Sequence, residues 1–274
     1  MLTRVDVVTD QGAVLTLPLW DASLGYLVKE ITGLDPVKAT ITASKFARID
    51  GTARQASSRE HRNIVLKLGY TPDYVTNDIQ RLRTFLYKFV MPKSLVLLRF
   101  YMNEVLFVQI RGEVESCETP LFSREPEVDI SIVCFQPDFV APEETLLSGT
   151  TAYDEEFVIE YPGSTPTGFE FELLVDQPVR EFQIHNRQIN GDVQILDFLG
   201  VGDLIAGDIV NISTVSGDKK ATLTRGGVAS SALYMVSPAS AWVNLMPGSN
   251  MFRIQFGGSP IPYSLSYVAR YGGL

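Results

Sequence analysis

The chain is organised around residues 33–68, which read GLDPVKATITASKFARIDGTARQASSREHRNIVLKL. The GLDP sequence at 33–36 predicts a turn, because proline fixes its own φ and biases the residue before it away from helix. A strand is predicted after this turn, at 40–45, with a hairpin-type turn at Asp50-Gly51. The β-branched and leucine-rich run at 64–68 predicts a buried strand at the other end of the segment.

A polar segment lies between these two predicted strands. Residues 52–61 contain only two alanines as apolar side chains, so the segment cannot bury a core face. It is either a floppy surface loop or an arm that a neighbouring molecule orders. Its arginines could also grip phosphate, but a glutamate beside them and the neutral charge balance of this half favour ion pairs between subunits. We therefore expect a subunit interface at Arg54, Arg59, Glu60 and Arg62.

Length and composition indicate a globular protein with two domains. A chain of 274 residues divides comfortably into two cores of roughly 130–140 residues. Its 45% hydrophobic and 20% charged residues are ordinary for a globular protein and argue against disorder. The N-terminus has no apolar run of a secretory signal, and no stretch is long enough to span a bilayer. We expect a protein that is made in the cytosol and does not insert into membranes.

The net charge of −9 is unevenly distributed. Residues 1–140 hold 16 Lys+Arg and 17 Asp+Glu, whereas residues 141–274 hold 7 and 15. Neither half has the positive excess that a nucleic-acid-binding domain needs to displace counterions. Direct DNA binding is therefore disfavoured.

The sequence offers no pattern for catalysis. Cys117 and Cys134 lack metal-ligand spacing and predict buried free thiols. Only two histidines occur, His61 and His185, which leaves little scope for a metal site or a catalytic dyad. No Gly-x-Ser-x-Gly or phosphate-cradling loop motif occurs. We expect no enzyme, with no catalytic residue, cofactor or metal site.

The first half is predicted to be strands with a single helix. The helix begins at Asn77 as N-cap, buries a face that runs from Ile79 to Phe89, and ends before Pro92. Six or seven strands with one helix packed outside them fit a β-barrel or sandwich. The strands expected on either side of this helix are 3–9, 13–19, 26–31, 64–68, 94–101, 104–112 and 128–135, with Met102-Asn103 as the hairpin connection between 94–101 and 104–112.

A change of composition separates the halves. Residues 136–149, with two prolines, two adjacent glutamates and a final Ser-Gly, are predicted to be a linker, so the domains are 1–140 and 141–274. The second half has no helix pattern, and its short strands with Gly-rich turns predict an antiparallel sandwich. Asn190-Gly191 is its strongest hairpin signal, and 233–236 is among its predicted strands.

The order and spacing of these pieces resemble the distal tail proteins (Dit) of long-tailed bacteriophages. In the first half the resemblance rests on the GLDP turn, on Asp50-Gly51, and on Arg62-Asn63-Ile64 with Leu66. In the second half it rests on Gly202-Asp203, on DIVNI at 208–212, on LMPGSNMF at 245–252 and on the tail 263–274 that ends YGGL.

The resemblance implies a mainly β structural protein of the virion tail tip, assembled in the host cytoplasm. It implies that residues 1–140 form a tail-tube-like β-barrel that closes into a homo-hexameric ring, and that residues 141–274 form a galectin-like sandwich. The implied partners are the tail tube protein on one side of the ring and baseplate hub, tail-associated and receptor-binding proteins on the other. DNA would pass through the bore without specific binding.

Carbohydrate binding by the second domain is the alternative, as a host-surface glycan attachment protein or a glycosidase accessory module. Galectins bind sugars with a histidine, an asparagine, an arginine and a tryptophan, and this chain has His185, Asn186, Arg187 and Trp242. It lacks the family's proline between the asparagine and the arginine, and Trp242 is followed by Val-Asn-Leu in place of a glycine and an acid. A domain that keeps the sandwich and docks other proteins is therefore the preferred interpretation.

Overall fold

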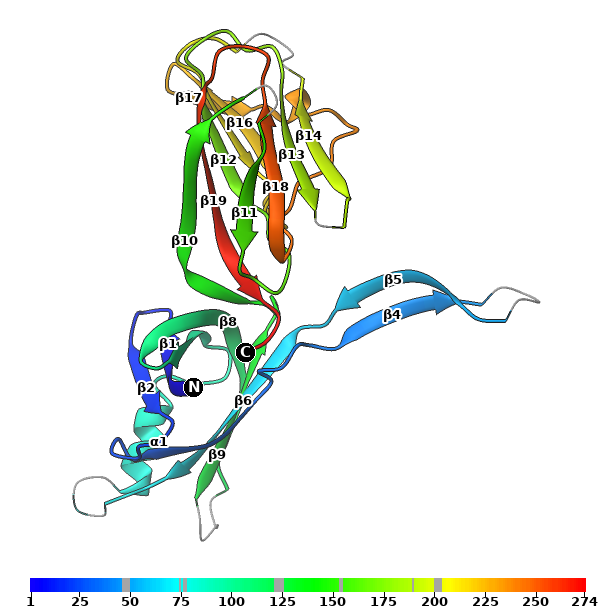
Figure 1. Cartoon of the computed structure of the whole chain (residues 1–274). Coiled ribbons are helices and arrows are strands. Elements are labelled where there is room, and N and C mark those ends of the chain that lie inside the picture. Colours follow the sequence, from blue (N-terminus) through cyan, green and yellow to red (C-terminus); the bar gives the residue numbers. More distant parts are fainter. Residues whose placement is uncertain are drawn as a thin grey trace. The chain divides into compact units, whose positions relative to one another are not determined.

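The computed structural model describes residues 1–45, 50–73, 75, 78–120, 126–152, 155–188, 190–199 and 204–274. It is mainly β, as predicted, and divides into two compact units (Figure 1). Unit 1 comprises Met1–Pro142 together with Tyr271–Leu274, and unit 2 comprises Glu143–Arg270. The last four residues thus pack with unit 1, whereas the sequence analysis assigned them to the second domain. No described helix is long and apolar enough to cross a membrane.

Unit 1 is a curled antiparallel sheet with the strand order β2-β1-β7-β8-β9-β6-β3. The curl comes from β8, whose first part pairs with β7 and whose second part pairs with β9. The two end strands of the sheet, β2 and β3, lie in contact with each other. The strands are β1 (Leu2–Thr9), β2 (Val14–Pro18), β3 (Tyr26–Thr32), β6 (Arg62–Tyr70), β7 (Leu95–Met102), β8 (Val105–Glu118) and β9 (Glu127–Cys134).

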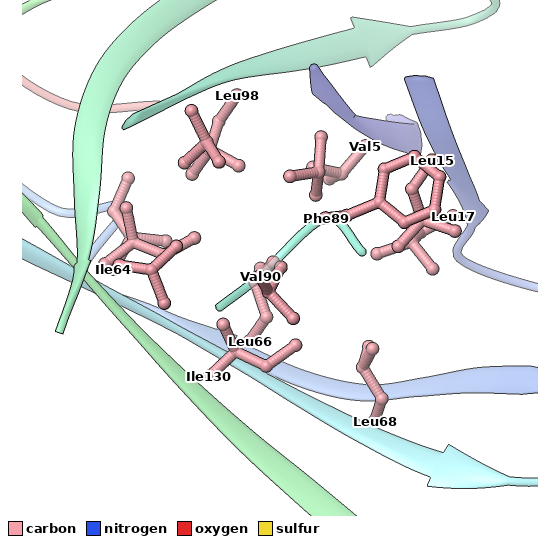
Figure 2. Close-up of a cluster of buried hydrophobic side chains, with 14 of the residues drawn as sticks. Val5, Leu15, Leu17, Ile64, Leu66, Leu68, Phe89, Val90, Leu98 and Ile130 are labelled. Carbon is pink, nitrogen blue, oxygen red and sulfur yellow. The ribbon is translucent and has the colours of Figure 1, made fainter. Parts of the chain in front are cut away.

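The core of unit 1 is built from the inward side chains of these strands and from the segment after helix α1 (Ile79–Leu86). Figure 2 shows Phe89 and Val90 between the strands, close to strand side chains such as Leu66 and Leu17. The predicted buried strand at 64–68 is confirmed, since its leucines and isoleucine alternate into this core as part of β6. Each fully buried side chain of this size contributes about 1.5–3 kcal/mol to folding.

Helix α1 is shorter than predicted. Its N-cap is Asp78, whose carboxylate accepts a hydrogen bond from Arg81 N at 2.7 Å, and the predicted N-cap Asn77 lies outside the described residues. The helix ends at Leu86 rather than near Pro92. Its side chains Leu82 and Leu86 pack into the core of unit 1, as expected for a single helix packed on the strands.

The connection between β7 and β8 lies one residue later than predicted. Met102 still pairs with Val105, so the two turn residues are Asn103 and Glu104, with φ of 49° and 64°. Positive φ at both central positions defines a type I′ turn, which matches the right-handed twist of the flanking strands.

Unit 2 consists of two antiparallel sheets, and its aromatic core is centred on Phe169, Phe171, Phe182 and Phe252. The first sheet has the order β17-β16-β15-β12-β19-β10 and the second β11-β18-β13-β14. The strands are β10 (Phe139–Thr150), β11 (Phe157–Tyr161), β12 (Glu170–Leu174), β13 (Phe182–Gln188), β14 (Val193–Phe198), β15 (Ile209–Ser213), β16 (Lys220–Arg225), β17 (Val228–Ser231), β18 (Gly248–Gln255) and β19 (Pro262–Tyr271). β10 and β19 each begin in one unit and end in the other.

Two predictions on secondary structure are wrong. The proposed linker 136–149 is mostly β10, a strand whose middle residues, such as Glu143 and Glu144, are exposed and therefore give no apolar alternation. The predicted strand 233–236 is a 3₁₀ helix, Leu233–Met235, in which only Met235 is buried. The linker is predicted from composition and the strand from its short apolar run, and neither property reports backbone pairing.

The carboxylate of Asp208 fixes the entry of β15 in unit 2. It is buried and accepts hydrogen bonds from Arg225 Nε at 2.8 Å, Arg225 Nη2 at 2.6 Å and Ile205 N at 2.9 Å. The hydrogen bonds from Arg225 hold the pKa of Asp208 below its ordinary value of 3.8, against the opposing effect of burial. A carboxylate whose pKa is depressed on folding stabilises the fold above the unfolded value, and this stabilisation is lost as pH falls through the folded value.

We expect Asp208→Asn to lower the midpoint of thermal unfolding at neutral pH and to flatten its dependence on pH below about pH 4. Circular dichroism melts at a series of pH values from neutral to about pH 2.5 measure both effects. Asp218→Asn is the matched control, because Asp218 pairs with Lys220 with both side chains more than half exposed. An acid dependence of Asp208→Asn that equals that of the wild type would contradict the assignment.

Candidate subunit interface

The polar segment of the sequence folds into a two-stranded ribbon rather than a loop. β4 (Ala39–Ser44) and β5 (Ala53–Arg59) pair antiparallel with each other and with no other described strand. Figure 1 shows this ribbon, hereafter the arm, extending away from the sheet of unit 1. Arg54 and the residues after it on β5 are exposed, and Ile41 on β4 is 65% exposed. The arm therefore buries almost nothing within its own chain.

The base of the arm is tied to unit 1 by charged groups. Arg59 binds both carboxylate oxygens of Asp138, with Nη2 to Oδ2 at 2.7 Å, and Asp138 is buried. This hydrogen bonding raises the pKa of Arg59. Glu60 accepts a hydrogen bond from Thr40 Oγ1 across the ribbon at 2.5 Å. Arg59 and Glu60 thus brace the arm within the chain, while Arg54 lies on its exposed part.

Arg62 is not an interface residue of the arm, which corrects the prediction. Its side chain is 1% exposed and lies at the start of β6, within unit 1. Its guanidinium donates to four backbone carbonyls and stacks on the Phe139 ring, 4.3 Å from the ring centroid. The acceptors are Pro137 O at 2.7 Å from Nε, Asp35 O at 2.8 Å from Nη1, Gly33 O, also from Nη1, and Gly272 O, from Nη2.

Arg62 therefore joins the GLDP turn to two distant parts of the chain. Burial lowers the pKa of its guanidinium, and the nearby Asp138 works in the opposite direction. Gly33, at φ +83°, has room for no side chain, since a Cβ there would lie 2.0 Å from Asn63 O. The turn is also bonded to the end of the chain, because Leu274 N donates to Leu34 O at 3.0 Å. The GLDP turn and Arg62, on which the resemblance partly rests, are thus in direct contact in the structure.

Sequence reasoning missed the partners of these arginines. Asp138 and Phe139 lie in the segment predicted to be a linker, and Gly272 contributes only a carbonyl oxygen, which any residue could supply. One feature of the sequence could have indicated a partner. Asp138 is a single carboxylate beside an aromatic residue, and it is a candidate to pair with one of the two arginines.

The structure does not gather the predicted sugar-binding residues into one site. On β13, His185 and Arg187 point outward, whereas Asn186 is fully buried and donates to Asn244 O at 2.8 Å and Asn250 Oδ1 at 3.0 Å. Asn186 is therefore a core residue and cannot contact a sugar, contrary to the prediction.

The other three candidates already have protein neighbours. His185 contacts Gln183 Oε1 at 2.9 Å, and burial together with Arg253 lowers its pKa. Arg187 pairs with Glu156. The ring of Trp242 lies beside Lys219, whose Nζ is 5.8 Å from the ring centroid. These contacts do not form the histidine–asparagine–arginine cluster that the sugar-binding alternative requires.

The cysteines and the potential metal ligands among the described residues are further candidate sites. Both cysteines are free, and burial raises the pKa of each thiol to about 11, so neither is an activated nucleophile. In the part of the chain that the structure describes, no group of three or more His, Cys, Asp or Glu side chains is arranged to hold a metal ion.

Comparison with known proteins agrees with this fold. Nearly the whole chain is similar in fold to the crystal structure of the Dit protein of phage SPP1, described there as a paradigm of the hub adsorption apparatus in phages that infect Gram-positive bacteria. The TM-score is 0.66 at 15% sequence identity, with 97% of this chain and 98% of the other covered. The protein therefore has the mainly β fold of this Dit protein.

A match to a protein family lies in the second half of the chain. Residues 162–271 match the family model for the siphovirus-type tail component, C-terminal domain. The resemblance to distal tail proteins is thus confirmed. A chain of the phage p2 baseplate in its activated conformation with strontium is also similar, with a TM-score of 0.46 and 11% identity over 97% of this chain and 98% of that one. No curated protein matches the sequence.

Proposed function

We propose that this protein is a non-enzymatic structural component of a phage tail tip, in which unit 1 assembles into a homo-hexameric ring at the distal end of the tail tube. Unit 2 serves as the galectin-like docking platform for baseplate and receptor-binding proteins. The tail tube protein binds the opposite side of the ring. DNA passes through the bore, and the near-neutral charge of the first half suits passage without retention of phosphate.

The observation that carries the proposal is the arm in a chain with the Dit fold. A two-stranded ribbon alone in water is marginally stable, and this one buries almost no apolar surface. Its base is nevertheless held by the Arg59–Asp138 pair, which orients it for contact beyond its own unit. Support for the tail-tip role comes from the family of residues 162–271 and from the SPP1 Dit fold.

Shortening the arm tests the ring. We expect a variant in which residues 41–57 are replaced by an Asn-Gly turn to stay folded but monomeric, because it keeps the Ala39–Arg59 and Thr40–Ser58 pairs and loses the exposed ribbon. Mass photometry and negative-stain electron microscopy should show rings of six copies for the wild type only. Thermal unfolding of the variant should stay within a few degrees of the wild type.

A charge reversal provides the matched comparison. Arg54→Glu changes an exposed arm residue and should weaken ring assembly, whereas Lys219→Glu makes the same change on an exposed residue of unit 2 and should leave assembly unchanged. Rings that form equally well without the arm would remove it from the interface. A wild-type protein that stays monomeric at high concentration would refute the ring itself.

A further inference from the structure

A second surface of unit 1 is built to receive another chain. A groove of about 700 Å³ lies between strand β2 and helix α1, and we call it the β2 groove. Its exposed rim includes three large apolar side chains, Val14, Leu24 and Phe85, which are 46%, 50% and 46% exposed. Apolar side chains grouped around one concavity mark an interaction site more often than the same residues scattered singly.

The free edge of β2 borders this groove. Ala13 O accepts from Thr9 N at 2.9 Å and Leu19 N donates to Thr3 O at 3.0 Å, so these residues form hydrogen-bonded pairs with β1. Pairs alternate along an antiparallel ladder, and the backbone N–H and C=O groups of Val14 and Thr16 therefore point away from β1. Both residues line the groove, and β2 pairs with β1 alone among the described strands.

This edge lacks the usual protection against pairing. Natural sheets blunt their free edges with charged side chains, bulges or prolines. β3, the other end strand, follows this rule with Lys29, Glu30 and a register shift between Val28 and Glu30. The sequence of β2 is VLTLP, and its only such protecting feature is Pro18, at its last position. Two residues with free hydrogen-bonding groups are thus left open to a partner strand.

The charge of the groove indicates the chemistry of its occupant. Its lining contains two cations, Arg81 and Lys88, and no carboxylate, although the chain as a whole has a net charge of −9. Arg81 and Phe85 are four residues apart on α1 and share one helical face, and Lys88 Nζ lies 5.8 Å from the Phe85 ring centroid. A cationic and aromatic wall thus faces the free edge of the sheet.

We propose that the β2 groove docks an extended segment of a partner protein in which apolar and acidic side chains alternate. The segment adds a strand to β2, with up to four backbone hydrogen bonds to Val14 and Thr16. Its apolar side chains contact Phe85 and Leu24, and its carboxylates pair with Arg81 and Lys88. The site is separate from the arm, so it stands whether or not the arm closes a ring.

A synthetic probe tests the site on the full chain. We expect an end-capped, fluorescein-labelled nine-residue peptide of alternating valine and glutamate to bind in fluorescence anisotropy, at least about tenfold more tightly than the valine–lysine peptide of the same length. Hydrogen exchange should slow at the amides of Val14 and Thr16 on binding. Measurements on the arm-shortened variant, with the ribbon truncated between Thr40 and Ser58, separate this site from ring assembly.

Two variants make the test specific. Thr16→Pro removes an outward N–H at an edge position, where proline is tolerated, so the protein should fold and the peptide should no longer bind. Arg81→Glu combined with Lys88→Glu should reverse the preference toward the valine–lysine peptide, and Lys219→Glu should leave it unchanged.

Three outcomes would overturn the proposal. The first is equal binding, or no binding, of the two peptides up to millimolar concentration. The second is unaltered binding by Thr16→Pro. The third is protection of the Val14 and Thr16 amides by ring assembly of the wild type alone, which would make a second copy of this chain the occupant of the edge.

Discussion

Arg62→Ala is expected to destabilise unit 1 by about 3–5 kcal/mol, because it removes a buried cation and leaves its carbonyl acceptors without donors. The four acceptors belong to three separate segments of the chain, so no single neighbour can replace the guanidinium. Arg62→Lys keeps the charge but not the planar fork and should recover only part of the loss. Urea or guanidinium denaturation, with the transition of unit 1 followed by hydrogen exchange, measures the difference.

Arg54→Ala is the matched control for this prediction. It removes an arginine of the same segment that is exposed on β5, and its effect on stability should stay within about 0.5 kcal/mol. If Arg62→Ala and Arg54→Ala unfold at the same denaturant concentration, the hydrogen bonds from the Arg62 guanidinium to the backbone carbonyls do not stabilise unit 1.

Gly33→Ala is expected to cost more than the strain of its backbone conformation alone. A φ of +83° is costly for alanine by about 1 kcal/mol or more, and the added Cβ would lie 2.0 Å from the backbone oxygen of Asn63, so the turn must move. That movement displaces Gly33 O from Arg62, and the total loss should reach at least about 3 kcal/mol when the lost hydrogen bond is included.

Gly12→Ala isolates the backbone component. Gly12 has φ +82°, almost the same value, and a Cβ there meets no atom within 4 Å. The excess destabilisation of Gly33→Ala over Gly12→Ala, measured in the same denaturation experiment, therefore reports the collision with β6. Equal destabilisation by the two substitutions would show that the turn moves away from Asn63 O without a loss of stability.

The sequence predicts the parts of this fold in which burial alternates along a strand. The sequence predicts β6 and β9 to within two residues of their ends because their aliphatic side chains alternate into the core of unit 1. The Asn190-Gly191 connection was equally clear, since the turn itself demands positive φ and Gly191 has φ +88°. β10 was missed because its central residues face solvent and its partner β19 lies more than a hundred residues away.

The candidate interface was predicted only in outline. The sequence predicts the arm because a polar stretch between two hydrophobic strands cannot form a core, but this pattern does not show that the arm is a two-stranded ribbon. Arg62 was grouped with the arm's arginines because it follows them in sequence, yet its environment is set by backbone carbonyls at Gly33, Pro137 and Gly272. Every residue has a backbone carbonyl, so no sequence pattern predicts which carbonyls accept hydrogen bonds from Arg62.

The bond between Arg62 and Gly272 O joins residues that are 210 positions apart. Unit 2 lies between them in the chain, so unit 2 is synthesised before this hydrogen bond within unit 1 can form. Long-range closure of this kind slows folding and extends the time during which sheet edges stay uncovered. During synthesis, unit 1 therefore lacks the Arg62–Gly272 hydrogen bond until residue 272 has been made, and its sheet edges are open to association with other chains during that time.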